Sequence, residues 1–129
     1  MVSPARASGA PLRAENVTRG QTLATRVTVA DRPAARLRGL IGRPPLGPGE
    51  GLLIEPCSGI HTFFMGFAID VVFLDAAGAV VAALGPVRPW RLTRIYPTAT
   101  AALELPPGTV AATGTTEGDR IEFAAAEGP

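Results

Sequence analysis

The residues of this chain whose types suit chemistry gather in one short segment. Residues 57–65 hold the only cysteine, the only histidine and one of the two methionines among 129 residues. The apolar run at residues 69–74 that follows contains a single carboxylate, Asp70. Thiolate, imidazole and carboxylate groups are the usual protein ligands of divalent transition metals. Cys57, His61 and Asp70 are therefore candidate ligands of such a metal, or of a small polar molecule.

The spacing of these three residues decides whether they meet. If residues 60–64 pair with residues 69–73 as a hairpin, His61 lies diagonally from Asp70 on one face, about 7 to 8 Å away at the backbone. A hydrogen bond between the imidazole and the carboxylate is within reach at that separation. Cys57 joins them only through a turn, because two residues four apart in an extended strand are about 13 Å apart.

Each of these side chains also has an ordinary structural interpretation. Cys57 can pack as a small hydrophobic residue, and His61 can bond to a backbone carbonyl. Asp70 can cap a turn or pair with an arginine. A third interpretation makes Cys57 a nucleophile with His61 as its base, but the sequence shows no oxyanion hole to support it.

A second group of polar and aromatic residues lies in the proline-rich stretch at residues 85–97. Loops held on a rigid sheet often carry binding residues, which favours Trp90 and Arg91 as contacts for a ligand. An arginine stacked on Trp90 is the structural alternative. Thr62 and Met65, from the segment around His61, complete the candidate binding residues.

The sequence predicts several short strands, which would position the candidate side chains. The alternation of apolar and polar residues at 22–29 indicates a half-buried strand, and the apolar run at 69–74 indicates a strand covered on both faces. The other strands are predicted at residues 52–54, 79–84, 101–105, 109–113 and 120–123.

One short helix is predicted after Asp31, with Pro33 in its first turn and Gly42 at its end. A chain with about seven short strands and one helix has too few helices for parallel crossovers. The predicted fold class is therefore α+β, mainly β, with an antiparallel sheet curled like a barrel. Residues 14–123 are predicted to form this single domain, between a disordered tail at 1–13 and a flexible tail at 124–129.

Six short motifs follow one another in a characteristic order along this predicted domain. They are RLRGLI at residues 36–41, GLLI at 51–54, IHTFFM at 60–65, IDVVFLD at 69–75, LELPPG at 103–108 and GDRI at 118–121. In this order they resemble domain-of-unknown-function family 192, over roughly residues 16–123. The resemblance implies a small β-rich domain and no particular reaction. The chain departs from the family pattern at Gly66 and Ala68, where members often carry a basic or polar residue and a proline.

The net charge and the hydropathy of the chain limit the partners and the location that we expect for it. Twelve basic and eleven acidic residues give a net charge of +1, which predicts no nucleic-acid partner. No stretch is long enough to span a membrane and no signal peptide is seen, so a cytoplasmic location is expected. We expect a non-enzymatic ligand-binding or accessory domain that holds a small polar ligand or a partner protein. The alternatives are a metal-binding protein that uses Cys57, His61 and Asp70 and, less favoured, a small hydrolase.

Overall fold

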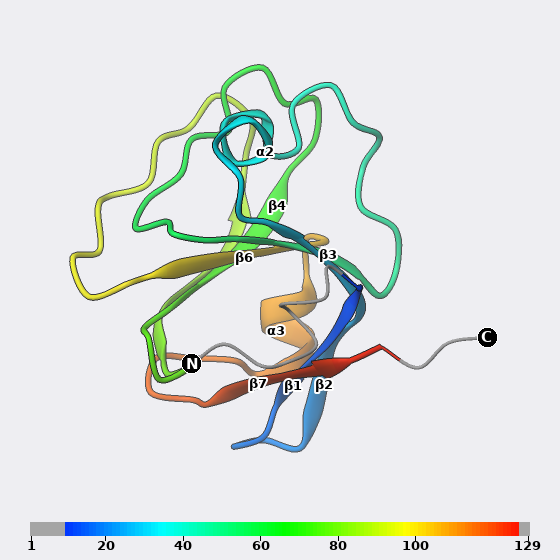
Figure 1. The fold of residues 1–129 in the computed structure, drawn as a ribbon, viewed down its shortest axis with the longest axis vertical. Helices are drawn as coiled ribbons and strands as arrows, with labels where there is room; N and C mark the ends of the chain where they lie inside the picture. Colours follow the sequence, from blue (N-terminus) through cyan, green and yellow to red (C-terminus); the bar gives the residue numbers. More distant parts are fainter. Residues whose placement is uncertain (1–9, 127–129) are drawn as a thin grey trace.

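One curled sheet organises the computed structural model, which describes residues 10–126 (Figure 1). Its strand order is β5-β4-β6-β3-β2-β1-β7. The strands are β1 (Leu12–Asn16), β2 (Gln21–Ala30), β3 (Glu50–Ile54), β4 (Ile69–Leu74), β5 (Val80–Val87), β6 (Ala101–Leu105) and β7 (Ile121–Ala125). Within residues 10–126 two short helices, α2 (Pro33–Arg38) and α3 (Thr109–Thr113), accompany them.

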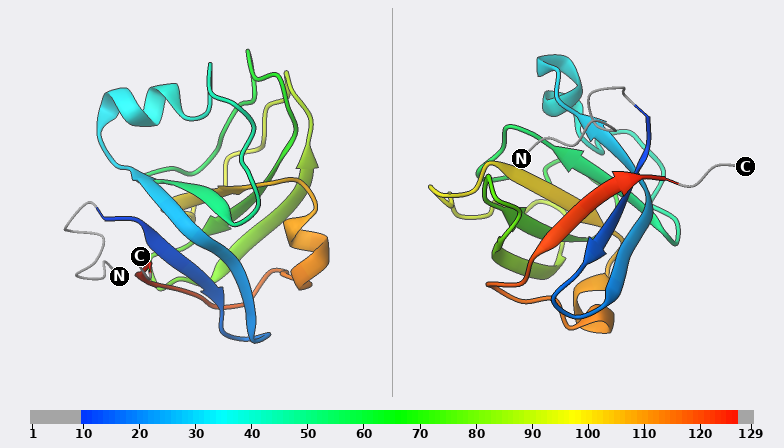
Figure 2. Two further views of the ribbon diagram at one scale, coloured as in Figure 1. Left: turned by 90° about the vertical axis from the view of Figure 1, so that its right-hand side faces the viewer. Right: turned by 60° about the horizontal axis from the view of Figure 1, so that its bottom comes forward.

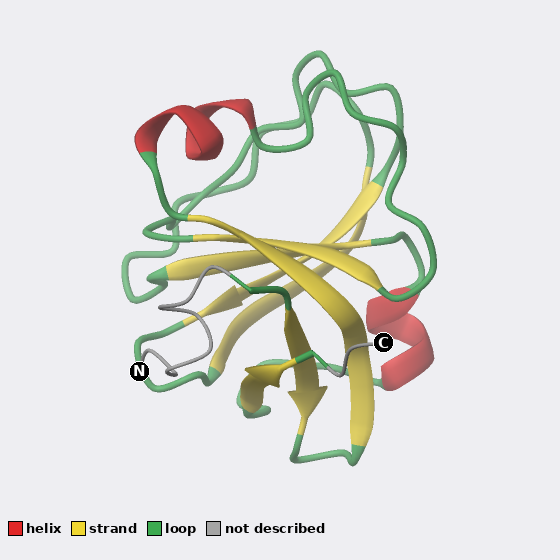
Figure 3. Ribbon diagram, turned by 45° about the vertical axis from the view of Figure 1, so that its right-hand side comes forward, coloured by secondary structure: helices red, strands yellow, loops and turns green. Residues whose placement is uncertain are grey.

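The two edges of the sheet meet and partly close the barrel (Figure 3). Ala79, just before β5, pairs with Arg120, just before β7. Ile121 N–H donates to the Gly78 carbonyl at 2.8 Å. Gly78 has a φ of +89°, and a Cβ there would lie 2.7 Å from the Ile121 carbonyl oxygen, so the closure requires glycine. The predicted curled, mainly β sheet is confirmed, although one pair, β2 with β3, is parallel.

The sheet separates two apolar layers. The inner layer lies inside the curl and includes Val72 and Leu103, and the outer layer includes Val71 and Phe73. The outer layer is covered by α2 and by the segments at 55–68 and 88–99, at the end opposite the β1–β2 turn (Figures 1 and 2). Because β4 has a layer on each side, all six of its residues are buried.

Residues 109–113 are helix α3, and the strand predicted there is wrong. Thr109 Oγ1 donates to the Pro106 carbonyl at 2.8 Å, and Val110 N–H donates to Asp70 Oδ2 at 2.7 Å. These bonds satisfy groups at the start of the helix, as capping residues do. The contact to Asp70 joins positions forty residues apart, so local β propensity could not reveal it.

The pairing of residues 60–64 with residues 69–73, on which a contact of His61 with Asp70 depended, does not form. Both sides of β4 are already occupied, by β5 and by β6. Residues 60–62 lie instead against residues 91–93, where His61 pairs with Leu92. The register that would have placed His61 diagonal to Asp70 is therefore absent.

The sheet extends slightly beyond the domain predicted at residues 14–123. Leu12 lies at the start of β1 and is fully buried, and it pairs with Ala125 at the end of β7. The remaining parts of the two predicted tails, residues 1–9 and 127–129, lie outside the described residues.

Candidate functional site

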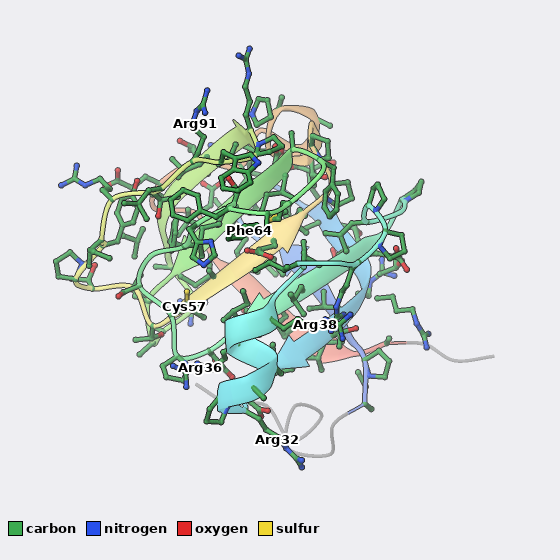
Figure 4. The ribbon with its side chains drawn as sticks, turned by 90° about the horizontal axis from the view of Figure 1, so that it is seen from above. Arg32, Arg36, Arg38, Cys57, Phe64 and Arg91 are labelled. Carbon is green, nitrogen blue, oxygen red and sulfur yellow. The ribbon has the colours of Figure 1, made fainter. Side chains whose placement is uncertain are left out.

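A cavity of about 100 Å³ lies between α2, residues 57–65 and the outer face of the sheet. Its walls bring together the chemically active side chains of this end of the molecule, and we call it the Glu104 pocket. These residues are Arg36, Arg38, Cys57, His61, Met65 and Glu104. Figure 4 shows Arg36 on the side of α2 that faces Cys57 and Arg38 on the other side of the helix.

Glu104 is a carboxylate placed in the middle of the sheet. It pairs in register with Leu52 of β3 and Val71 of β4, and both neighbours belong to the outer apolar layer. Its side chain is only 3% exposed. Among the described residues none donates a hydrogen bond to its Oε1 atom. Burial raises the pKa of Glu104 to about 7, because an apolar environment disfavours the charged form.

Two arginines form the rim of the pocket on the α2 side. Arg36 and Arg38 are both exposed, and within residues 10–126 neither forms an ion pair. The Arg38 Nε donates to the Ile41 carbonyl at 3.4 Å. The helix is held over the sheet by Leu40, which is buried in the outer layer just after its end. The rim is therefore positive, whereas the floor is a carboxyl group.

Cys57 lies in the pocket as a thiol. Its Sγ donates to the Gly59 carbonyl at 3.2 Å. Burial raises the pKa of the thiol above its ordinary value, and the nearby Glu104 acts in the same direction, while Arg36 opposes them. Because the thiolate is the nucleophilic form, this environment disfavours the reactive state of Cys57.

His61 lines the pocket from an exposed position. Its Nδ1 accepts a hydrogen bond from the Phe63 N–H at 3.2 Å, and its ring stacks on the Phe63 ring with centroids 5.0 Å apart. An Nδ1 that accepts carries no proton, so in the neutral imidazole the proton is on Nε2. His61 thus offers a fixed N–H donor at the mouth of the pocket.

Thr62 joins the two covering loops and faces away from solvent. Its Oγ1 donates to the Arg88 carbonyl at 2.6 Å and accepts from the Arg91 N–H at 2.9 Å. Its carbonyl accepts from the Trp90 N–H at 2.9 Å and from the Met65 N–H at 3.2 Å. Thr62 has no exposed surface, so its position is that of a structural connector. Met65 is buried in the outer layer and forms part of the pocket wall.

Trp90 and Arg91 lie outside the pocket, on the surface beside it. The Trp90 ring is 56% exposed and stands 4.7 Å, between centroids, from the ring of Phe64. Trp90 and Phe64 both have a positive backbone φ angle, 61° for Trp90 and 65° for Phe64. Bulky residues rarely adopt this backbone conformation, and such strain clusters at functional sites. Arg91 points outward from the molecule (Figure 4).

Asp70 is not brought to Cys57 and His61. It lies on the inner side of β4, where its Oδ2 accepts from Val110 and its Oδ1 packs against Gly85. Within the part of the chain that the structure describes, no group of three or more His, Cys, Asp or Glu residues is placed to hold a metal ion. The three residues proposed as metal ligands are thus divided between the two faces of the sheet.

Sequence reasoning missed Glu104, Arg36 and Arg38 as site residues. Arg36 and Arg38 look like the solvated face of a helix, which they also are. Glu104 carried a usable signal, because it is the single carboxylate in the otherwise apolar run at residues 101–105. A carboxylate in the central strand of a small sheet is buried unless one face is open to water, and α2 closes that face here.

Comparison with known proteins places the chain in a family. A model of the DUF192 family, described as an uncharacterized ACR, matches residues 14–123. The chain belongs to the DUF192 family. The resemblance seen in the ordered motifs is therefore confirmed.

Two archaeal relatives support this membership. A UPF0127 protein of Thermococcus sibiricus is 35% identical over 115 residues, which cover 84% of this chain and 72% of the relative. Another UPF0127 protein, from Pyrococcus furiosus, is 33% identical over 114 residues, covering 84% of this chain and 95% of the relative.

Solved structures share the DUF192 fold. A protein of unknown function from Novosphingobium aromaticivorans superimposes with a TM-score of 0.74 at 22% identity, over 95% of this chain and 91% of that one. A protein from Sinorhizobium meliloti, named as a candidate transcription regulator, gives a TM-score of 0.72 at 24% identity, over 87% and 91%. At these identities the likeness concerns the fold. None of the helices in residues 10–126 is long and apolar enough to cross a membrane.

Proposed function

We propose that this DUF192 domain is a non-catalytic binding domain that holds a small polar ligand in the Glu104 pocket. The observation that carries the proposal is the carboxyl group of Glu104, which lines the cavity and whose buried Oε1 atom has no hydrogen-bond donor among the described residues. A buried polar oxygen without a partner costs about 1 to 3 kcal/mol, and more when it is charged. A ligand that donates to this oxygen removes that cost.

The pocket walls suggest the form of this ligand. Its inner end carries an N–H or O–H group that donates to Glu104. Its outer end carries an anionic group, because Arg36 and Arg38 stand exposed at the rim without ion-pair partners among the described residues. The Nε2 of His61 adds a third contact. A cavity of about 100 Å³ accepts a compact molecule or the end group of a larger one.

The geometry supports binding better than covalent catalysis. A nucleophilic cysteine needs a lowered pKa and a base within hydrogen-bond distance. Cys57 has a raised pKa, and its thiol bonds to a backbone carbonyl while the Nδ1 of His61 is occupied by Phe63. The small-hydrolase alternative therefore gains no support from these two residues.

A fragment screen by two-dimensional ¹⁵N NMR tests the proposal. The probes are small polar molecules that carry both a donor and a carboxylate, with glycine, β-alanine and glycolate among them. We expect the binding fragments to shift amide signals of α2, of residues 57–65 and of β6.

Two matched variants decide where the fragments bind. Glu104→Gln should weaken binding by about tenfold, since it removes the negative charge and exchanges one acceptor oxygen for an NH2 donor. Glu122→Gln makes the same chemical change in a separate hollow of about 110 Å³ next to β7 and should leave binding unchanged. Fragments that gather in that second hollow, or that bind Glu104→Gln as well as the parent protein, contradict the proposal.

A further inference from the structure

Four large apolar side chains protrude from the loops beside the Glu104 pocket. We call them the aromatic ledge: Phe64, Trp90, Leu92 and Ile95, which are 69, 56, 73 and 62% exposed. Phe64 contacts Trp90, Leu92 pairs with His61, and the side chain of Ile95 lies against Gly59. The ledge therefore spans two chain segments, which lie together at one end of the molecule (Figures 1 and 2).

The ledge is held rigidly outward. Thr62 connects both segments through its hydroxyl and its carbonyl, and Thr93 Oγ1 adds bonds to the N–H and carbonyl groups of Ile60. Phe64 and Trp90 are kept in positive-φ conformations that bulky residues seldom adopt. Collapse of these rings into the outer layer would bury apolar surface, yet the backbone holds them in solvent. Exposed apolar patches of this kind mark contact surfaces.

The charge around the ledge is of one sign. Residues 57–69 and 85–100 contain no aspartate or glutamate, whereas they carry Arg88, Arg91 and Arg94. Within the described chain none of these three arginines forms an ion pair. Arg36 and Arg38 project at the same end (Figure 4). Since the whole chain has a net charge of only +1, these two segments are more positive than the chain as a whole, and its acidic residues lie outside them.

We propose that the aromatic ledge docks this domain onto an anionic lipid surface. Tryptophan and other apolar side chains partition into the interface of a bilayer, where their rings sit among the headgroups. Arginines beside them keep their stems near the apolar groups and place their guanidinium groups on lipid phosphates. The negative charge of an anionic leaflet complements the arginines around the ledge, where the two segments carry no aspartate or glutamate.

The shape of the ledge favours lipid over a folded protein partner. Stable protein interfaces need close shape complementarity, with anchors of one partner filling hollows of the other. Here each of the four side chains keeps more than half of its surface in solvent. A bilayer adapts to separate protruding side chains without a preformed hollow. An acidic protein surface is the competing occupant, and the experiment includes it.

Trp90 is the only tryptophan of the chain, so its fluorescence reports directly on the ledge. The whole protein is mixed with vesicles of phosphatidylcholine containing phosphatidylglycerol, with vesicles of phosphatidylcholine alone, and with poly-L-glutamate. With the anionic vesicles we expect the emission to shift to shorter wavelength and the protein to co-sediment. Binding to these vesicles should be at least about tenfold stronger than binding to the neutral ones. Salt at about 0.5 M should weaken the binding, because it screens surface charge.

Matched variants distinguish binding through the ledge from nonspecific adsorption of the protein to vesicles. Phe64→Ser with Leu92→Ser, and separately Arg91→Gln with Arg94→Gln, should each reduce vesicle binding by about tenfold or more. Val17→Ser, at an apolar position 45% exposed in the β1–β2 turn, should bind like the parent protein. Thermal melting confirms that each variant is folded.

Three results overturn the proposal. One is the absence of an emission shift with anionic vesicles at low salt. Another is equal sedimentation of the ledge variants and the parent protein. The third is a shift with poly-L-glutamate but none with vesicles, which would assign the ledge to an acidic protein instead. None of these readouts involves the Glu104 pocket, so the two proposals can fail separately.

Discussion

Glu104 of β6 and Asp70 of β4 lie one register position apart and project from opposite faces of the same sheet. Asp70 pairs with Leu105 and Val71 pairs with Glu104, so consecutive positions carry the two buried carboxylates. Each has one oxygen without a hydrogen-bond donor among the described residues. Asp70 nevertheless anchors α3 through Val110, whereas Glu104 faces a cavity. One carboxylate therefore holds a helix, and the other lines a cavity.

The buried carboxyl of Glu104 should make the stability of the protein depend on pH. Its pKa is raised from 4.5 to about 7, so the folded state binds the proton more tightly than the unfolded state. The contribution of Glu104 to stability is then greatest below about pH 4.5, falls as the pH rises to about 7 and stays low above it. The fall is about 3 kcal/mol on this account.

Glu104→Gln should remove this slope, because the amide does not titrate. Urea unfolding between about pH 5 and pH 8 measures the free energy of unfolding of both proteins, with Glu122→Gln as the exposed control. We expect the difference between Glu104→Gln and the parent protein to change from about pH 5 to about pH 7 and to level off above it. A difference that stays constant from about pH 5 would show that the carboxyl of Glu104 is already ionised there in the folded protein, so that burial does not raise its pKa.

Gly85→Ala should destabilise the attachment of α3. A Cβ at Gly85 would lie 2.4 Å from Asp70 Oδ1, a distance that forces the carboxylate away from its bond to Val110. We expect a loss of about 2 kcal/mol or more in the free energy of unfolding. Gly66→Ala is the matched control, since nothing lies within 4 Å of the added methyl group. Equal melting temperatures of the two variants would be incompatible with the packing described here.

Thr62→Val should loosen both covering loops while keeping the side-chain volume. The change removes the bonds of the hydroxyl to the Arg88 carbonyl and from the Arg91 N–H, and leaves both groups poorly paired. We expect a loss of about 2 to 3 kcal/mol and faster hydrogen exchange at the amides of Trp90 and Arg91. Thr116→Val, at an exposed turn position, serves as the control. Unchanged exchange in Thr62→Val would remove Thr62 from its connecting role.

Asp119 anchors a second polar network, at the end of the barrel away from the pocket. Its Oδ2 accepts from Arg19 at 2.6 Å and from Asn16 at 2.9 Å, and these hydrogen bonds lower the pKa of the carboxyl. A lowered pKa adds stability above the unfolded value of about 3.8, and this contribution disappears as the pH falls through the folded value.

The variant Asp119→Asn should therefore be less stable by about 2 kcal/mol near neutral pH. The difference in the free energy of unfolding between this variant and the parent protein should narrow below about pH 4, where Asp119 becomes protonated first in the unfolded chain and then, at lower pH, in the folded protein. Acid titration followed by circular dichroism measures both proteins. A gap that stays constant down to about pH 2 would mean that the charge of Asp119 contributes nothing to the network.

Local patterns predicted most of the fold. Alternation located β2, and the doubly apolar run located β4, because both signals depend on neighbours along the chain. The helix at 109–113 was missed since its capping partner, Asp70, is distant in sequence. β1 was missed because Leu12 follows a stretch of small and polar residues that is typical of a tail.

The candidate site was harder to predict than the fold. The segment around Cys57 and His61 was singled out because unusual residue types gather there, and in the structure it lines the Glu104 pocket. Asp70 was grouped with these two residues through a hairpin that does not form, and in a sheet with period two the register decides which face each carboxylate occupies. The arginines of α2 reach the pocket through the packing of a helix onto the sheet, which the sequence pattern of the helix does not specify.

A crystal structure of the protein with a polar fragment selected by NMR would show whether Glu104 binds a ligand. We expect the fragment in the Glu104 pocket, with an N–H or O–H group about 2.9 Å from a carboxyl oxygen of Glu104 and its anionic group beside Arg36 or Arg38. A fragment bound in another hollow, while Glu104 keeps no ligand contact, would contradict this expectation.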